Sequence, residues 1–136
     1  MIVADVNTVA YLLINGDKTA LAQQIFQKDN NWCTPPLWRH EFLNVLATLV
    51  RRGSGEFADM EQIWHTALHL FSGQERAVDP ISVLRLAYQS GASAYDAQYI
   101  ALAQEFGVPC VTEDSTLANK FPTVAYSMQV FWDNNA

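Results

Sequence analysis

The sequence predicts an α/β fold in three layers, with a short, mostly parallel central sheet flanked by helices. Short apolar segments alternate along the chain with segments whose apolar residues recur at helical spacing. The apolar segments are continuous rather than alternating with polar residues, which is typical of strands buried on both faces. The chain has 136 residues, half of them hydrophobic, so we expect residues 1–136 to form a single domain.

The expected elements alternate regularly between the two types. The strand candidates cover residues 2–5, 32–34, 76–79, 108–112 and 123–126. The helix candidates cover residues 8–14, 19–27, 37–52, 56–71, 81–89, 93–105 and 115–120. This alternation favours βαβ units, and therefore a parallel sheet.

Turn residues separate the elements in the first half of the chain. The first strand ends at an acid, Asn15-Gly16 closes the first helix, and residues 29–31 (DNN) precede the second strand. Pro35-Pro36 opens the third helix, since proline is tolerated in a first turn, and residues 53–55 (GSG) stop it. The fourth helix carries one apolar stripe, made of Phe57, Met60, Trp64, Ala67, Leu68 and Phe71.

The second half follows the same pattern. Pro80 starts the fifth helix, and Ser90-Gly91 ends it. Gly107 stands just past the sixth helix, as a C-terminal glycine does, and the apolar run VPCVT follows as a strand. The short helix 115–120 and the strand 123–126 complete the alternation.

Composition and charge exclude several classes of protein. Eight Lys+Arg against fourteen Asp+Glu give a net charge of −6, which argues against a general polyanion binder. No apolar run approaches the roughly 20 residues of a membrane span, and the start lacks the basic region of a signal peptide. Cys33 and Cys110 are far apart in apolar segments, which indicates buried reduced thiols. We expect a cytoplasmic protein without a membrane partner.

Four carboxylates occupy similar places in this scheme. Asp5 ends the first strand, and Asp114 follows the strand 108–112. Glu41 and Asp96 lie near the starts of helices that should face the same edge of the sheet. Ligands of open α/β sheets bind at the carboxyl ends of the strands, so these acids could share one pocket.

Each acid also has a purely structural interpretation. Asp5 and Asp114 suit helix N-caps, and Ser93 with Asp96 fits a capping box. Glu41 is an acid that the helix dipole favours near a helix start. Apolar neighbours flank Asp5, Glu41 and Asp96, however, and an acid that serves only the surface needs no such setting.

Converging carboxylates repel one another and resist burial unless cations neutralise them. Mg²⁺ or Mn²⁺ suits carboxylate and water ligands, and such ions stabilise the attacking and leaving oxygens of a phosphoryl displacement. Arg39, two residues before Glu41, is a candidate for a phosphate contact.

The sequence resembles PIN-domain ribonucleases of the VapC toxin type over essentially its whole length. The matching segments are residues 5–7 (DVN), 39–46 (RHEFLNVL), 93–103 (SAYDAQYIALA) and 111–114 (VTED). Val6 departs mildly from the family, which often has a small polar residue there. The resemblance implies a PIN-like fold, in which the sheet lies between layers of helices.

The resemblance also implies a site and partners. Asp5, Glu41, Asp96 and Asp114 would bind Mg²⁺ or Mn²⁺ and act in catalysis. Asn7 would orient a ligand or water by hydrogen bonds, and Thr112 corresponds to the family's hydroxyl two places before the last acid. The implied reaction is metal-dependent hydrolysis of RNA, by the toxin component of a type II toxin–antitoxin pair. The implied partners are a second copy in a homodimer and an antitoxin whose helix lies in an apolar groove. The acid beside the site, Glu113, is expected to be a solvated neighbour.

Three alternatives remain open at this point. A haloacid-dehalogenase-like phosphatase would use Asp5 as its nucleophile, but Asn7 stands where that class has its second acid. A receiver domain would need paired acids after the first strand. A non-catalytic PIN-like domain that only binds a partner would have no need of four acids.

The surplus of negative charge then has a location. Setting the four candidate acids aside leaves ten acids against eight bases, so the rest of the chain is only two charges from neutral. The net charge is therefore better interpreted as a cation site on a nearly neutral domain, which weakens the argument against nucleic acid.

Overall fold

The computed structural model describes residues 1–135 and contains one four-stranded sheet. The strands are β1 (Ile2–Ala4), β2 (Trp32–Cys33), β3 (Cys110–Val111) and β4 (Ala125–Tyr126), in the order β2-β1-β3-β4. All three pairings are parallel, and the register places Val3 opposite both Cys33 and Cys110. The predicted parallel sheet is confirmed.

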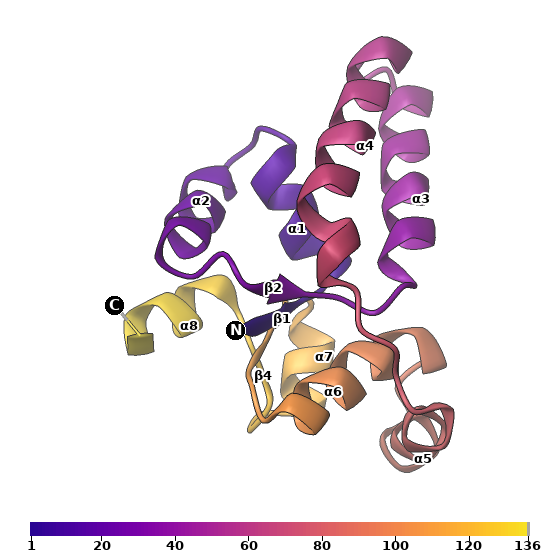
Figure 1. Cartoon of the computed structure of the whole chain (residues 1–136), viewed down its shortest axis with the longest axis vertical. Helices are drawn as coiled ribbons and strands as arrows, with labels where there is room; N and C mark the ends of the chain where they lie inside the picture. The colour runs from indigo at the N-terminus through magenta and orange to yellow at the C-terminus, as the bar shows by residue number, and fades with distance from the viewer. Residues whose placement is uncertain (136) are drawn as a thin grey trace.

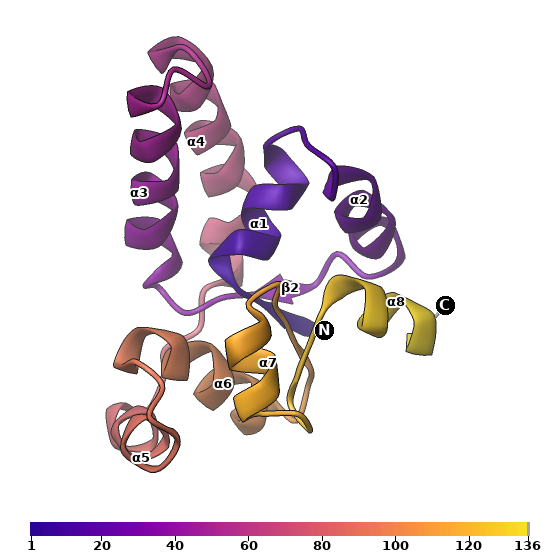
Figure 2. The ribbon, with the colours of Figure 1, turned by 180° about the vertical axis from the view of Figure 1, so that it is seen from behind.

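Helices cover both faces of the sheet, which gives the predicted three layers (Figures 1 and 2). One layer holds α1 (Val6–Leu13), α2 (Thr19–Lys28), α3 (Trp38–Arg51), α4 (Phe57–Phe71) and, beside α2, α8 (Met128–Asn135). The other holds α5 (Pro80–Ser90), α6 (Ala94–Phe106) and α7 (Ser115–Lys120). In Figure 1, α3 and α4 run side by side as a helical hairpin that extends away from the sheet.

Capping residues set the ends of several helices. Asp5 caps α1 by accepting a hydrogen bond from the Thr8 amide at 3.0 Å, so α1 begins at Val6 rather than at residue 8 as predicted. Gly91 and Gly107 follow α5 and α6 with φ angles of 76° and 62°, the left-handed conformation that glycine adopts without strain.

Aromatic side chains fill the core between the sheet and the α3–α4 hairpin. Trp38 is fully buried, and its ring centroid lies 5.9 Å from those of both Phe71 and Trp64. Phe57, at the other end of the predicted stripe on α4, is 70% exposed and lies outside this core. Cys33 and Cys110 are buried and unbonded, as predicted.

The strand expected at residues 76–79 does not form. The short 3-10 helix Ser72–Gln74 leads instead to a single bridge between Thr34 and Glu75. Pro35 and Pro36 follow Thr34 and have no N–H to donate, so the pairing cannot continue past this bridge. Val78, the apolar residue that suggested a strand, packs against buried side chains of α5 and α6 instead.

The last helix, α8, lies where the sequence pattern indicated no element. Met128 is fully buried, and Phe131 and Trp132 pack against the same cluster of side chains as the residues of α2. Among residues 1–135, no helix is long and apolar enough to cross a membrane.

Candidate functional site

Three of the four predicted acids lie where β1, β2 and β3 lead into helices, and the fourth lies at the start of α6, which follows α5. Asp5 directly follows β1, Asp114 follows β3, Glu41 stands in the first turn of α3, and Asp96 in the first turn of α6. Two of the structural interpretations are confirmed as well, because Asp5 and Asp114 both act as N-caps. A capping carboxylate still has unused lone pairs, so capping and ligand binding are compatible.

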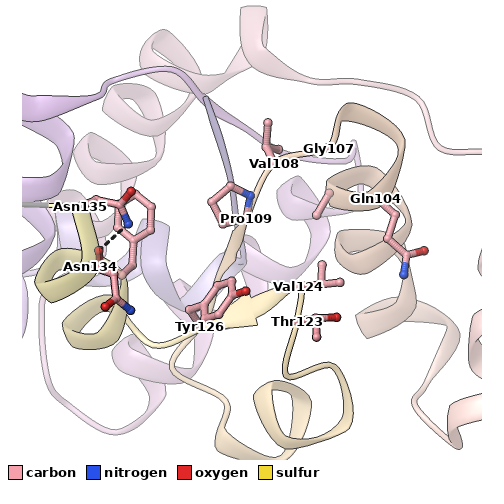
Figure 3. Close-up of a pocket in the computed structure, with 11 residues that line it drawn as sticks. Gln104, Gly107, Val108, Pro109, Thr123, Val124, Tyr126, Asn134 and Asn135 are labelled. Atoms are coloured by element: carbon pink, nitrogen blue, oxygen red, sulfur yellow. Dashed lines mark hydrogen bonds between the residues drawn. The ribbon is translucent and has the colours of Figure 1, made fainter.

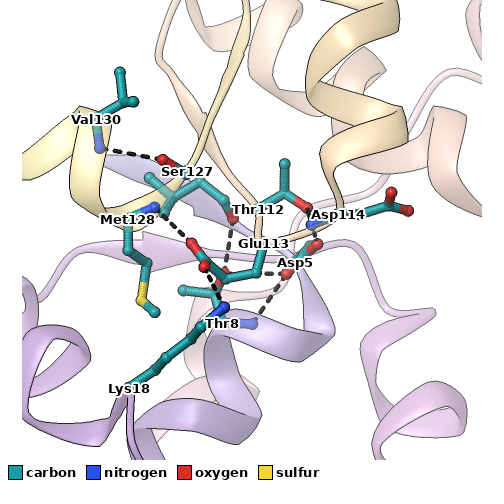
Figure 4. Close-up of polar contacts among 10 residues, drawn as sticks. Asp5, Thr8, Lys18, Thr112, Glu113, Asp114, Ser127, Met128 and Val130 are labelled. Atoms are coloured by element: carbon teal, nitrogen blue, oxygen red, sulfur yellow. Dashed lines mark hydrogen bonds and ion pairs between the residues drawn. The ribbon is translucent and has the colours of Figure 1, made fainter.

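Asp5 is the most deeply buried of the four, with 6% of its surface exposed. Its carboxylate accepts hydrogen bonds from the Thr8 amide and hydroxyl, and from the Thr112 hydroxyl (Figure 4). Burial raises the pKa of Asp5, these hydrogen bonds partly offset the rise, and the charge of Asp114 adds to it.

Thr112 connects two of the acids through hydrogen bonds. Its hydroxyl donates to Asp5 and accepts a hydrogen bond from the Asp114 amide at 3.0 Å (Figure 4). The Asp114 carboxylate in turn accepts from the amides of Thr116 and Leu117 at the start of α7. The loop between β3 and α7 is thereby fixed relative to Asp5.

Glu41 and Asp96 respond to the charges of the other acids. Burial raises the pKa of Glu41, and the charges of Asp96 and Asp5 raise it further. Burial also raises the pKa of Asp96, followed by the charge of Asp114. Each acid therefore interacts electrostatically with at least one of the other three, and we refer to the four as the acidic cluster.

Two further hydrogen bonds place these side chains. The Ser93 hydroxyl accepts from the Asp96 amide at 3.0 Å, which is one half of the predicted capping box. The Tyr99 hydroxyl donates to Glu41 Oε1 at 2.6 Å across the interface between α6 and α3. Sequence reasoning gave Tyr99 no role, although its position three residues after Asp96 puts both on neighbouring positions of one helix face.

The chemistry of the donor set suits a hard divalent cation, because four carboxylates with mutual repulsion lie at one edge of the sheet. Within residues 1–135, however, no three acidic, histidine or cysteine side chains stand close enough together to enclose an ion as placed. Binding an ion would therefore require the carboxylates to turn toward it.

Two other predicted site residues lie at the edge of this cluster. Asn7 is exposed and lines a groove beside Tyr11 and Lys18. Arg39 forms a two-pronged ion pair with Glu75, in which Nε and one terminal nitrogen lie 2.6 and 3.0 Å from the two carboxylate oxygens. A phosphate contact by Arg39 would have to compete with Glu75, and it stays a prediction.

Glu113 is not the solvated neighbour that the sequence suggested. Its side chain is only 13% exposed, pairs with Lys18 at 2.7 Å, and accepts from the Met128 amide at 2.7 Å (Figure 4). Charge and position alone could not reveal this role, because α8 was not recognised.

A cavity of about 560 Å³ opens elsewhere, between the end of α6, strand β4 and α8 (Figure 3). Pro109 and Val124 line it from the residues that precede β3 and β4, so it lies at the amino ends of the strands. Its lining residues carry no charged side chain and include none of the four acids. The acidic cluster therefore occupies the opposite edge of the sheet from this cavity.

Comparison with known proteins agrees with the fold. The PIN domain family model matches residues 2–120. Ribonuclease VapC3 of Pyrobaculum aerophilum is 31% identical over 129 residues, which is 90% of this chain and 96% of that protein.

Solved structures show the same fold. PAE2754 from Pyrobaculum aerophilum has a TM-score of 0.78 and 23% identity, covering 98% of this chain and 97% of that one. FitAcB from Neisseria gonorrhoeae has a TM-score of 0.70 and 16% identity, over 95% and 99% of the two chains. FitAB bound to a DNA fragment has a TM-score of 0.70 and 15% identity, over 94% and 95%. The chain belongs to the family of VapC-type PIN-domain ribonucleases.

Proposed function

We propose that this chain is an endoribonuclease that hydrolyses RNA phosphodiester bonds with Mg²⁺ or Mn²⁺, and that it is the toxin of a toxin–antitoxin pair. The observation that carries the proposal is the cluster of Asp5, Glu41, Asp96 and Asp114 at the carboxyl edge of the sheet. The pKa values of Asp5, Glu41 and Asp96 are raised by burial and then by neighbouring acids, so ionising the cluster costs free energy. Keeping these acids ionised and close together lowers the stability of the folded protein, and a bound divalent cation would offset this loss.

The four carboxylates are the residues that would hold the cation. A bound Mg²⁺ or Mn²⁺ would make a water molecule more acidic and stabilise negative charge on a phosphate. The residues of the chain supply the framework for this chemistry. Thr8 and Thr112 orient Asp5, Thr112 also holds the loop that carries Asp114, and Tyr99 holds Glu41.

The choice of RNA as substrate rests on the relative whose name specifies it, ribonuclease VapC3. RNA would reach the acids from the open edge of the sheet, beside the groove that Asn7 and Lys18 line. Such a substrate agrees with the cytoplasmic location expected from the sequence. The dehalogenase-like phosphatase loses its support, because the PIN family model matches the chain over residues 2–120.

The experiment that tests this function compares substrates and metals. Purified protein is incubated with structured RNA, single-stranded RNA and p-nitrophenyl phosphate, each with Mg²⁺, with Mn²⁺ and with EDTA. We expect internal cleavage of at least one RNA with metal and none with EDTA. Hydrolysis of the phosphomonoester without RNA cleavage would support the phosphatase instead. If neither RNA nor the phosphomonoester is cleaved and the protein binds a partner tightly, the result would support a non-catalytic PIN-like domain.

A groove between α3 and α4 is the surface that we assign to the antitoxin. Its volume is about 600 Å³, and Leu43, Leu46, Val50, Met60 and Trp64 are among its apolar lining residues. Leu43 and Phe57 on its rim are 46% and 70% exposed. Apolar side chains left open in this way fit the apolar face of a partner helix. FitAB, which has the same fold, is described as bound to DNA, an assembly that fits a paired regulatory role.

The surface that we assign to the homodimer is a stripe on α5. Ile81, Leu84 and Tyr88 follow one another at spacings of three and four residues and are 59%, 63% and 89% exposed. Tyr95, which is 63% exposed, lies in the first turn of α6 directly before Asp96. A second copy on this stripe would bring two acidic clusters near one another.

A further inference from the structure

Tyr99 links the two helices that carry Glu41 and Asp96. The side chain lies on α6, is 2% exposed, and packs in the cluster that contains Val3, Cys33 and Cys110. Its hydroxyl reaches 2.6 Å from Glu41 Oε1, a residue 58 positions away in the sequence. Buried phenols need a hydrogen-bond partner, and this one has a carboxylate.

Glu41 depends on this bond more than Asp5 or Asp114 depends on any single partner. Asp5 accepts three hydrogen bonds, and the Asp114 carboxylate accepts two from backbone amides. Within residues 1–135, no second hydrogen bond holds the Glu41 carboxylate. Glutamate has one more rotatable bond than aspartate, so it loses more conformational freedom when it is fixed.

The bond keeps a fixed direction. The phenol donates and the Glu41 carboxylate accepts, because an ionised carboxylate has no proton to donate. One carboxylate oxygen of Glu41 is thereby occupied, and the other accepts no hydrogen bond from residues 1–135.

We propose that Tyr99 is a positioning residue that fixes Glu41 through this hydrogen bond, so that the free carboxylate oxygen is available to the divalent cation. The inference rests on the proposed metal-dependent function and adds a residue to it. Outer partners that orient a ligand typically contribute 10- to 100-fold to metal affinity or activity.

The test measures Mn²⁺ binding without RNA, by the electron paramagnetic resonance signal of free Mn²⁺. The variants are Tyr99→Phe, which removes one oxygen and keeps the ring, and Tyr126→Phe as a control on β4. We expect Tyr99→Phe to weaken Mn²⁺ binding about tenfold, and Tyr126→Phe to leave it unchanged. RNA cleavage by Tyr99→Phe should recover when the Mg²⁺ concentration is raised, because the defect lies in ion binding.

A double-mutant cycle separates positioning from packing. Glu41→Asp keeps the negative charge but shortens the side chain by one methylene, so the carboxylate no longer reaches the Tyr99 hydroxyl. If Tyr99→Phe does not fold, the Mn²⁺ affinity of Glu41→Asp tests the loss of the same hydrogen bond. Tyr99→Phe should add little to the loss already caused by Glu41→Asp. Equal Mn²⁺ affinity of Tyr99→Phe and wild type would overturn the inference, as would full additivity in the cycle. Absence of Mn²⁺ binding by the wild type would overturn the proposed function itself.

Discussion

The Lys18 ammonium lies 2.7 Å from the Glu113 carboxylate, so the residue that precedes Asp114 ties together two loops far apart in sequence. The same carboxylate accepts from the first amide of α8 at 2.7 Å, and Lys18 also lies 5.2 Å from the centre of the Tyr11 ring. Glu113 thus connects the loop that carries Asp114 with α8 and with the segment that leads into α2.

Removing Glu113 should destabilise the protein more than removing Lys18. Glu113→Ala leaves the Met128 amide without its acceptor, which costs about 1–3 kcal/mol of unfolding free energy. Lys18→Met removes an ion pair whose lysine is 47% exposed, and such pairs contribute at most about 1 kcal/mol. Urea unfolding measures both. Equal losses in the two variants would show that the bond to α8 contributes nothing.

The sequence and the structure agree best where local chemistry decides the outcome. The parallel sheet, the Asp5 cap and the glycine that ends α6 all follow from neighbouring residues. Val78, the apolar residue that suggested a strand at residues 76–79, packs instead onto α5 and α6. A local pattern cannot distinguish this tertiary contact from a strand.

The same reasoning applies to the site. The positions of Asp5, Glu41 and Asp96 could be predicted because each acid interrupts an apolar setting, and that of Asp114 because it follows an apolar strand. The contributions of Tyr99 and Glu75 could not be predicted from the sequence. Each depends on a partner far along the chain, Glu41 at 58 residues from Tyr99 and Arg39 at 36 residues from Glu75. Arg39 was a candidate for a phosphate contact because the sequence does not show that it forms an ion pair with Glu75.

Glu41→Gln should stabilise the metal-free protein at neutral pH. The pKa of Glu41 is raised in the folded state, so its contribution to stability is full below its ordinary pKa near 4.5 and is lost as the pH rises through the folded value. The advantage of the variant in EDTA should therefore appear above this pH and disappear below it. Thermal unfolding measured against pH checks this. Glu105→Gln, an exposed position on α6, is the control and should show no such trend.

Glu75→Ala should destabilise the protein by about 1–3 kcal/mol, because the Trp38 indole N–H loses its acceptor in a buried setting. Glu75→Gln keeps an acceptor and should lose less. Arg39, and then Trp38, hold the pKa of Glu75 below its ordinary value, so this contribution is present above that value and is lost as the pH falls. Denaturant titrations at pH 7 and pH 3 measure the difference in unfolding free energy between the wild type and Glu75→Ala. A difference at pH 3 as large as that at pH 7 would contradict the expected pH dependence.

Leu84→Lys should separate the proposed homodimer into monomers, because it places a charge in the centre of the exposed stripe on α5. Sedimentation velocity of the wild type and the variant measures this. Leu43→Lys, in the groove assigned to the antitoxin, is the matched control and should leave the dimer intact. A monomeric wild type, or a dimer that survives Leu84→Lys, would refute this placement of the interface.

The central claim is that the four acids form one metal-dependent site for RNA cleavage. The most direct measurement is the initial rate of RNA cleavage at saturating Mg²⁺ for Asp5→Asn, Glu41→Gln, Asp96→Asn and Asp114→Asn, beside the surface controls Asp59→Asn and Glu105→Gln. We predict that each site variant loses about a hundredfold or more in rate and that both controls match the wild type. Cleavage at the wild-type rate in Asp5→Asn and Asp96→Asn would contradict the account.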